Sequence, residues 1–159
     1  MSDTKIRGFE IVNAYKNNGI DIPKRATAGS AGYDIASAED FIVTARKIGM
    51  VPTGLKVFML PSEVFMIYLR SSIAIKDSVM IAQNVAVIDA DYYDNPDNEG
   101  HFFIPILNYS DYPFQIKKGD RIAQGIFMTY SLTDGDTYSG AKRNGGFGST
   151  DITTAKSEQ

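Results

Sequence analysis

Short apolar stretches, each a few residues long, alternate with turn-forming residues along most of the chain. β-branched and aromatic residues dominate these stretches, and glycine, proline, serine and aspartate separate them. Because the apolar positions show no sustained 3.6-residue period, the pattern favours strands over helices. The predicted strands are 9–12, 33–35, 41–44, 55–59, 64–69, 79–83, 85–88, 102–107, 114–116 and 122–130, with one short helix near 71–76.

Many short strands at this spacing predict an all-β domain, built as a sandwich, jelly roll or barrel. The sequence contains no internal repeat and no interdomain linker, so we expect a single β domain over residues 1–140. From Thr133 onward, glycine, serine, threonine, aspartate and lysine replace most apolar residues. Such a segment buries too little apolar surface to fold alone, which predicts a flexible C-terminal arm over residues 141–159.

Composition narrows the classes of function. The 159 residues are 43% hydrophobic and 22% charged, as in an ordinary globular domain, and no stretch approaches a membrane span. The absence of cysteine excludes disulfides, thiolate zinc sites and a cysteine nucleophile. The N-terminus lacks the apolar run of a secretory signal, so we expect a cytoplasmic protein. A net charge of −3 argues against duplex nucleic acid as a partner, but a few local cations suffice for a polyphosphate.

Two polar clusters interrupt the apolar pattern in the first half of the chain. In the run AGYDI, Asp34 is a carboxylate inside an apolar strand, where it serves equally well as a structural hydrogen-bond partner or as a site residue. Arg70, Ser71 and Ser72 follow the apolar strand 64–69. One cation, two hydroxyls and adjacent N–H groups can hold a phosphate, although the same residues also suit a capped turn.

Three further clusters lie in the second half. In VIDADY, strand alternation predicts that Asp89 and Asp91 share one face, either as a base and a metal anchor or as a solvated edge. The run GDRIAQ reads as a turn that enters a strand carrying Gln124. The run KRNGGFGST supplies cations, glycines and hydroxyls, but it lacks the Lys-Ser/Thr ending of a P-loop. The single histidine, His101, has no second imidazole for a metal site.

In this order, the five clusters resemble the five motifs of the trimeric dUTPase family, in a bacterial or phage-like form. AGYDI, RSS, VIDADY, GDRIAQ and GGFGST match them in turn, and the resemblance covers about residues 22–150. Each motif is weak alone, but five in order are specific. The chain departs from the family pattern at Ala86, where glycine is common, at the insertion-like segment 94–100, and at Asp151, where glycine is usual.

The resemblance implies a jelly-roll β-sandwich that forms a homotrimer and hydrolyses dUTP to dUMP and pyrophosphate with Mg²⁺. It assigns Asp89 to orient and deprotonate the attacking water and to bond the deoxyribose 3′-hydroxyl. It assigns Asp34 to hold the magnesium–triphosphate through bound water, and Ser71 to the oxygen where leaving-group charge develops.

The resemblance also implies contacts for the rest of the nucleotide. Tyr92 packs on the sugar and excludes a 2′-hydroxyl, and backbone groups around 83–87 read uracil. Phe147 stacks on the base, while Lys142 and Arg143 compete for the outer phosphates. The implied substrate-binding set is Arg70, Ser71, Ser72, Gln83, Asn84, Val85, Val87, Asp89, Tyr92, Gln124, Lys142, Arg143, Phe147, Gly148, Ser149 and Thr150.

Three alternatives remain beside this interpretation. A dCTP deaminase resembles dUTPases in fold but needs a glutamate base in the strand after the third motif, and 102–107 contains no carboxylate. Some dUTPase-like phage proteins act on a repressor, and segment 94–100 is where such a protein partner would be expected to bind. An inert jelly-roll structural protein would not be expected to carry all five polar clusters.

Overall fold

A computed structural model describes residues 5–138 of the protein. Strands dominate this part of the chain, with one short α-helix, α1 (Ser71–Asp77), and two 3-10 turns, η1 (Asn13–Tyr15) and η2 (Ala90–Tyr92). No helix in this range has the length and apolar character to cross a membrane. The strands are β1 (Gly8–Ile11), β2 (Lys24–Arg25), β3 (Tyr33–Ala36), β4 (Phe41–Val43), β5 (Ile48–Pro52), β6 (Leu55–Phe58), β7 (Glu63–Leu69), β8 (Val79–Ile81), β9 (Ala86–Asp89), β10 (Phe103–Asn108), β11 (Phe114–Ile116) and β12 (Arg121–Thr129).

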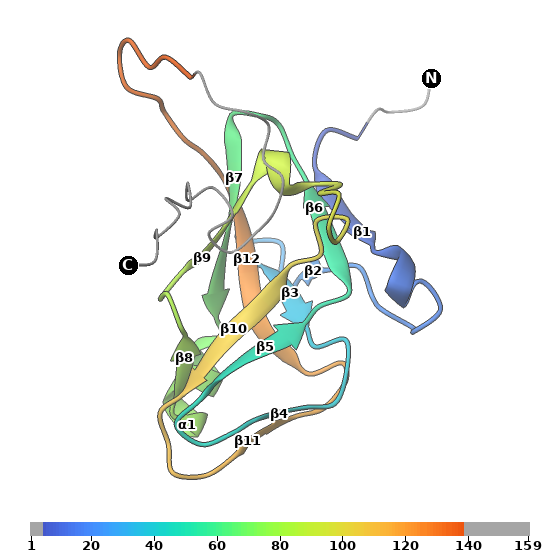
Figure 1. The fold of residues 1–159 in the computed structure, drawn as a ribbon, viewed down its shortest axis with the longest axis vertical. Coiled ribbons are helices and arrows are strands. Elements are labelled where there is room, and N and C mark those ends of the chain that lie inside the picture. Colours follow the sequence, from blue (N-terminus) through green and yellow to red (C-terminus); the bar gives the residue numbers. More distant parts are fainter. Residues whose placement is uncertain (1–4, 139–159) are drawn as a thin grey trace, which may run out of the picture.

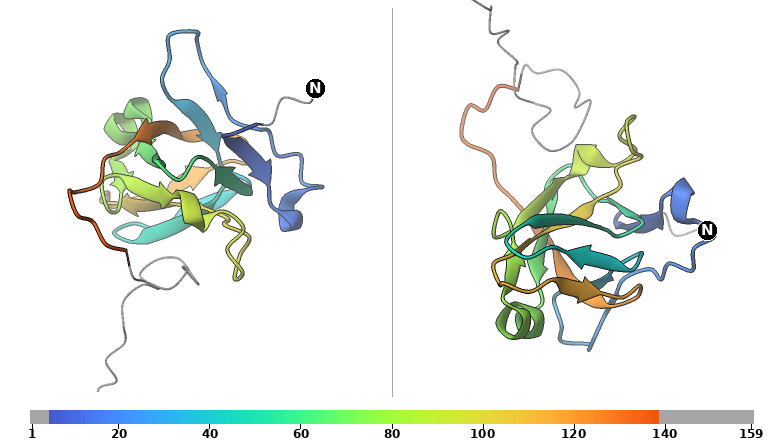
Figure 2. Two further views of the ribbon diagram at one scale, coloured as in Figure 1. Left: turned by 90° about the horizontal axis from the view of Figure 1, so that it is seen from above. Right: turned by 60° about the horizontal axis from the view of Figure 1, so that its bottom comes forward.

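Antiparallel sheets build the molecule (Figure 1). The largest has five strands in the order β2-β3-β12-β7-β9, and a three-stranded sheet has the order β5-β10-β8. Two-stranded ribbons β1-β6 and β11-β4 complete the sandwich. Figures 1 and 2 show the β1-β6 ribbon on one flank and β8, β9 and α1 on the opposite flank. The predicted all-β, jelly-roll-like sandwich is therefore confirmed.

Strict alternation along β7 divides the five-stranded sheet into an inner and an outer face. Phe65 and Ile67 are 0% exposed and belong to the core, whereas Val64, Met66 and Tyr68 point the other way and are only partly buried. The inner face packs closely, because a Cβ on Gly125 of β12 would lie only 1.9 Å from the Phe65 ring. Within residues 5–138, the outer face leaves apolar side chains such as Val87 and Met128 exposed.

Two strands were missed by the pattern of the sequence. The strand β5 contains Gly49 and ends in Pro52, two residue types that normally argue against a strand. In the fold, Gly49 lies against Phe41 and Val43, where a Cβ would be 2.9 Å from the Phe41 ring. Close packing selects glycine here. The strand β2 has only two exposed residues, so it leaves no apolar pattern to detect.

The prediction that Asp89 and Asp91 share one face of a strand was wrong. The strand β9 ends at Asp89, and the chain turns into η2, so strand alternation does not continue to Asp91. The predicted strand 79–83 also ends early, at Ile81, because Asn84 adopts a left-handed conformation with φ +66° and closes a tight turn. This turn connects β8 in one sheet to β9 in the other.

His101 is buried, with 8% of its surface exposed, and its ring lies against those of Tyr15 and Phe103. Its Nε2 accepts a hydrogen bond from the Gly54 N–H at 2.9 Å, which requires that nitrogen to be unprotonated. Burial lowers the pKa of His101 from 6.5 to about 4. The folded protein therefore holds a neutral imidazole at a pH where the unfolded chain already binds a proton.

Because of this histidine, we expect the free energy of unfolding to decrease as the pH is lowered. Neutral His101 makes its full contribution to the free energy of unfolding above the unfolded pKa near 6.5. This contribution is lost as the pH falls toward 4, because protonation then favours the unfolded chain. Between about pH 7 and 5 the loss should be about 2 kcal/mol. Denaturant unfolding across this range should show it, and His101→Gln should flatten the slope. An equally steep slope in the variant would contradict this.

Candidate functional site

The first polar group lies on the outer face of the five-stranded sheet. Asp34 on β3 stands directly opposite Gln124 on β12, which in turn stands opposite Tyr68 on β7. Residues that pair directly share one face, so these side chains point to the same side. Gly32 makes room for the amide, because a Cβ there would lie 2.7 Å from the Gln124 Oε1. The strand register thus brings the first and fourth motifs together.

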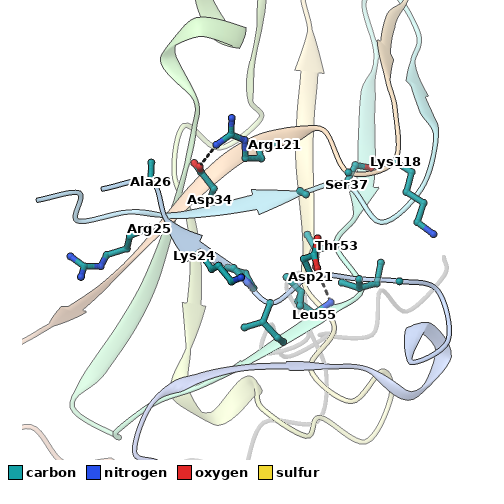
Figure 3. Close-up of a pocket in the computed structure, with 16 residues that line it drawn as sticks. Asp21, Lys24, Arg25, Ala26, Asp34, Ser37, Thr53, Leu55, Lys118 and Arg121 are labelled. Atoms are coloured by element: carbon teal, nitrogen blue, oxygen red, sulfur yellow. Dashed lines mark hydrogen bonds and ion pairs between the residues drawn. The ribbon is translucent and has the colours of Figure 1, made fainter. Parts of the chain in front are cut away.

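Two arginines flank the carboxylate of Asp34, whose side chain is 17% exposed. The Arg121 Nη1 donates to its Oδ2 at 2.9 Å (Figure 3). The Arg70 Nε lies 3.7 Å from the Asp34 Oδ1. The Arg70 Nη1 also donates to the Arg121 carbonyl oxygen at 3.1 Å, which ties the start of β12 to the end of β7. Two cations per carboxylate leave local positive charge, which suits an anionic ligand.

Two hydroxyls complete this group. Ser71 and Ser72 are the exposed first residues of α1, directly after Arg70. The helix begins there because the N–H groups of Ile73 and Ala74 both donate to the Arg70 carbonyl oxygen at 3.1 Å. We call this group the arginine cluster; its members are Asp34, Arg70, Ser71, Ser72, Arg121 and Gln124.

Arg121 is the member that the sequence analysis missed. Arg121 lies within the GDRIAQ run, and its place in that run is a signal that could have identified it. Only Gln124 of this run was predicted as a site residue. A register irregularity between Arg121 and Ala123 of β12 falls at this point of the β3–β12 pairing. Such an irregularity is difficult to read from sequence, because the pattern of apolar residues alone does not reveal which strand position lies opposite which.

The second polar group lies along the hairpin-like turn from β8 to β9 and along β9 itself. Gln83 and Asn84 are exposed at the tip of this turn, where the Asn84 N–H donates to the Ile81 carbonyl oxygen at 2.9 Å. Asp89 is exposed at the end of β9, whereas Tyr92 is only 5% exposed and offers little more than an edge to any ligand. We call this group the hairpin cluster; its members are Gln83, Asn84, Val85, Val87, Asp89 and Tyr92.

Asp34 of the arginine cluster and Asp89 of the hairpin cluster lie far apart within one protomer. Asp89 pairs with Val64 on β7, whereas Asp34 is aligned through β12 with Tyr68, four residues further along β7. Three strand spacings of about 4.8 Å and four residues of about 3.3 Å separate them, a diagonal of about 20 Å. One protomer therefore does not bring Asp34 and Asp89 together at a single phosphate group.

A pocket of about 360 Å³ opens beside Asp34 (Figure 3). Its walls come from residues 19–26 and from Ser37, Thr53, Lys118 and Arg121, among others. It shares only Asp34 and Arg121 with the arginine cluster and no residue with the hairpin cluster. This hollow in the protomer is therefore not the complete predicted site.

The donors fit magnesium only when it arrives with a polyphosphate. Within residues 5–138, no group of three or more histidine, aspartate or glutamate side chains could hold a metal ion. Asp34 lies between two arginines, whose charge alone would disfavour a metal ion there but would attract phosphates. Since Mg²⁺ keeps several waters, one carboxylate beside a triphosphate is a reasonable donor set.

The fifth predicted cluster lies outside the described residues. This applies to Lys142, Arg143, Phe147, Gly148, Ser149 and Thr150, to Asp151, and to the arm predicted over 141–159.

Fold and geometry together define a jelly-roll-like β-sandwich protein with a divided polar site. The family model for dUTPase matches residues 18–151. The chain is 50% identical over 147 residues to the deoxyuridine 5′-triphosphate nucleotidohydrolase of Lactococcus lactis subsp. lactis (strain IL1403), covering 92% of this chain and 98% of that protein. This chain belongs to the dUTPase family.

Solved structures of dUTPases have a similar fold. The crystal structure of dUTPase from Streptococcus mutans superposes with a TM-score of 0.77 at 42% identity and covers 80% of this chain and 99% of that chain. The dUTPase from phage phi11 of S. aureus has a TM-score of 0.69 at 19% identity, covering 87% of this chain and 99% of that chain, which shows a shared fold.

Proposed function

We propose that this protein hydrolyses dUTP to dUMP and pyrophosphate. The convergence of Asp34, Arg70 and Arg121 carries the proposal, because a carboxylate between two guanidinium groups builds a local anion site on a protein of net charge −3. It lies at the family's motif positions, and the lactococcal relative is named for this substrate. In the cytoplasm, this reaction limits uracil incorporation into DNA and supplies dUMP for thymidylate synthesis.

We propose that the protein acts as a homotrimer, in which the two clusters meet across subunits. Each protomer has two different apolar surfaces on its outer faces, as the alternation of the strands requires. A ring closed by heterologous contacts needs such non-equivalent surfaces. The apolar residues on the outer face of the five-stranded sheet include Val64, Met66, Val87, Ile126 and Met128. The apolar residues on the outer face of the three-stranded sheet include Ile48, Met50, Met80 and Leu107.

In the proposed mechanism, the arginine cluster binds the triphosphate and the hairpin cluster supplies the base. Arg70 and Arg121 neutralise phosphate charge, and Ser71 donates to the oxygen where leaving-group charge develops. Asp89 from a neighbouring subunit orients the attacking water and accepts its proton. Asp34 would hold Mg²⁺ through bound water, and the ion, when bound, would neutralise charge on the triphosphate.

Base and sugar selection are assigned to the hairpin cluster. Its exposed tip, with Gln83 and Asn84, offers backbone and amide groups to the edge of uracil. The narrow accessible edge of the Tyr92 ring sterically excludes a 2′-hydroxyl. Steric exclusion discriminates against ribose more strongly than the loss of a weak contact would.

Particular residues argue against the two alternative functions, a dCTP deaminase and a regulatory protein. The strand β10 presents no carboxylate, which disfavours the glutamate-dependent chemistry of a dCTP deaminase. Segment 94–100, proposed for a regulatory partner, uses Asp94 and Glu99 for contacts within its own protomer.

Pyrophosphate release from dUTP, UTP, dTTP and dCTP tests the proposal directly. We expect turnover of dUTP in strong preference to the other three nucleotides. Deamination of dCTP, or UTP turnover as fast as that of dUTP, would show that the assignment is wrong.

Residues 141–159 are proposed to close over the bound nucleotide. A stop after Gly140 should lower dUTP turnover at least about tenfold, because Phe147 and the cations Lys142 and Arg143 would be lost from the site. Thermal unfolding and sedimentation should stay the same. Full activity in the truncated protein would remove these residues from the site.

A further inference from the structure

The segment that follows η2 is tied to the N-terminal part of the protomer. The Lys56 Nζ lies 2.5 Å from the Asp94 Oδ1, and Lys56 is only 9% exposed. The Asn13 backbone N–H donates to the Glu99 carboxylate at 2.9 Å. Figure 1 shows this segment between η2 and the β1-β6 ribbon. Both ends of residues 94–99 are therefore held against neighbouring elements.

Within this segment, the amide of Asn98 braces Tyr92. The Asn98 Nδ2 donates to the Tyr92 hydroxyl oxygen at 2.7 Å and to the His101 carbonyl oxygen at 3.2 Å. The Tyr92 hydroxyl donates to the same carbonyl at 3.3 Å. The Asn98 Oδ1 accepts the Gly100 N–H at 3.0 Å, which fixes the amide orientation and leaves Nδ2 facing the tyrosine.

The backbone of the segment also closes onto Tyr92. Gly100 has φ +80°, and a Cβ there would lie 2.4 Å from the Tyr92 carbonyl oxygen, so only glycine fits. The Asn95 N–H donates to that same oxygen at 3.2 Å. Tyr92 is thus held at its carbonyl by the backbone of the segment and at its hydroxyl by the side chain of Asn98.

We propose that Asn98 is a positioning residue that sets the selectivity for deoxyribose through the Tyr92 hydroxyl. This inference rests on the proposed function, in which the edge of Tyr92 excludes a 2′-hydroxyl. A steric wall rejects an extra hydroxyl only while it cannot move aside. Because Tyr92 is 5% exposed, a small rotation of its ring changes the accessible edge. Asn98 prevents that rotation by holding the far end of the ring.

The measurement is the ratio of kcat/KM for dUTP to kcat/KM for UTP. Asn98→Ala should lower this ratio about tenfold, because displacement of a contact by a fraction of an ångström costs much of its effect. The change should come from faster UTP turnover, with the KM for dUTP little altered. Asp97→Ala is the matched control: this exposed residue lies in the same segment, and it should leave the ratio unchanged.

A double-mutant cycle separates positioning from stability. Tyr92→Phe keeps the ring and removes the braced hydroxyl, so it should lower the ratio as Asn98→Ala does, and the double variant should lose no more. An unchanged ratio in Asn98→Ala with a lower melting temperature would overturn the proposal. If Asn98→Ala does not fold, an unchanged ratio in Tyr92→Phe overturns it. A wild-type protein without preference for dUTP would instead refute the proposed function.

Discussion

Asp89→Asn should abolish most dUTP turnover while the protein remains folded. An amide has nearly the shape of the carboxylate, but it does not accept the proton of the attacking water. General-base catalysis contributes roughly 10²–10⁴-fold, or about 3–5 kcal/mol of the barrier. Because Asp89 is exposed at the end of β9 and is not part of the core, its replacement should change the melting temperature little.

Asp91→Asn provides the matched control two residues away. It makes the same chemical change in η2, on an exposed side chain that the structure does not place on a strand face with Asp89. Steady-state pyrophosphate release should stay near wild type for Asp91→Asn and fall at least about a hundredfold for Asp89→Asn. Equal losses in both variants would mean that the local charge, and not a base at Asp89, matters. A near wild-type rate for Asp89→Asn would remove it from the mechanism.

The all-β class followed from the sequence because most strands combine apolar residues with clear turn signals. The predicted strand 114–116 coincides with β11 (Phe114–Ile116), and 64–69 differs from β7 (Glu63–Leu69) by one residue. The missed strand β5 has a clear physical cause. Gly49 is in a strand because of what packs over it, and local propensity does not contain that information.

The candidate site was predictable in composition but not in arrangement. The order of the polar clusters along the chain does not specify that Asp34 stands opposite Gln124, because strand register depends on long-range pairing. The pairing of Arg121 with Asp34, 87 residues apart, had no local signal either. The contacts of segment 94–100 with Lys56 and Asn13 are equally non-local.

Two inactive variants should restore one another when they assemble together. Arg70→Ala removes a cation from the arginine cluster, and Asp89→Asn removes the base from the hairpin cluster. We expect each homotrimer to retain no more than about 1% of wild-type turnover. Since Asp34 and Asp89 lie about 20 Å apart in a protomer, we expect a complete site to require one cluster from each of two subunits. A trimer that contains both variants can therefore rebuild an intact site.

The amount of restored activity follows from the geometry of a three-membered ring. In either mixed composition, one of the three directed interfaces joins an intact arginine cluster to an intact hairpin cluster, so turnover should reach about one third of wild type. Co-expression of the two variants with different affinity tags, followed by sequential purification on both, yields only mixed trimers. A control trimer of differently tagged Asp89→Asn subunits should remain inactive. If the mixed trimers of Arg70→Ala and Asp89→Asn are also inactive, both clusters act within one subunit, and the proposal of a site shared between subunits is wrong.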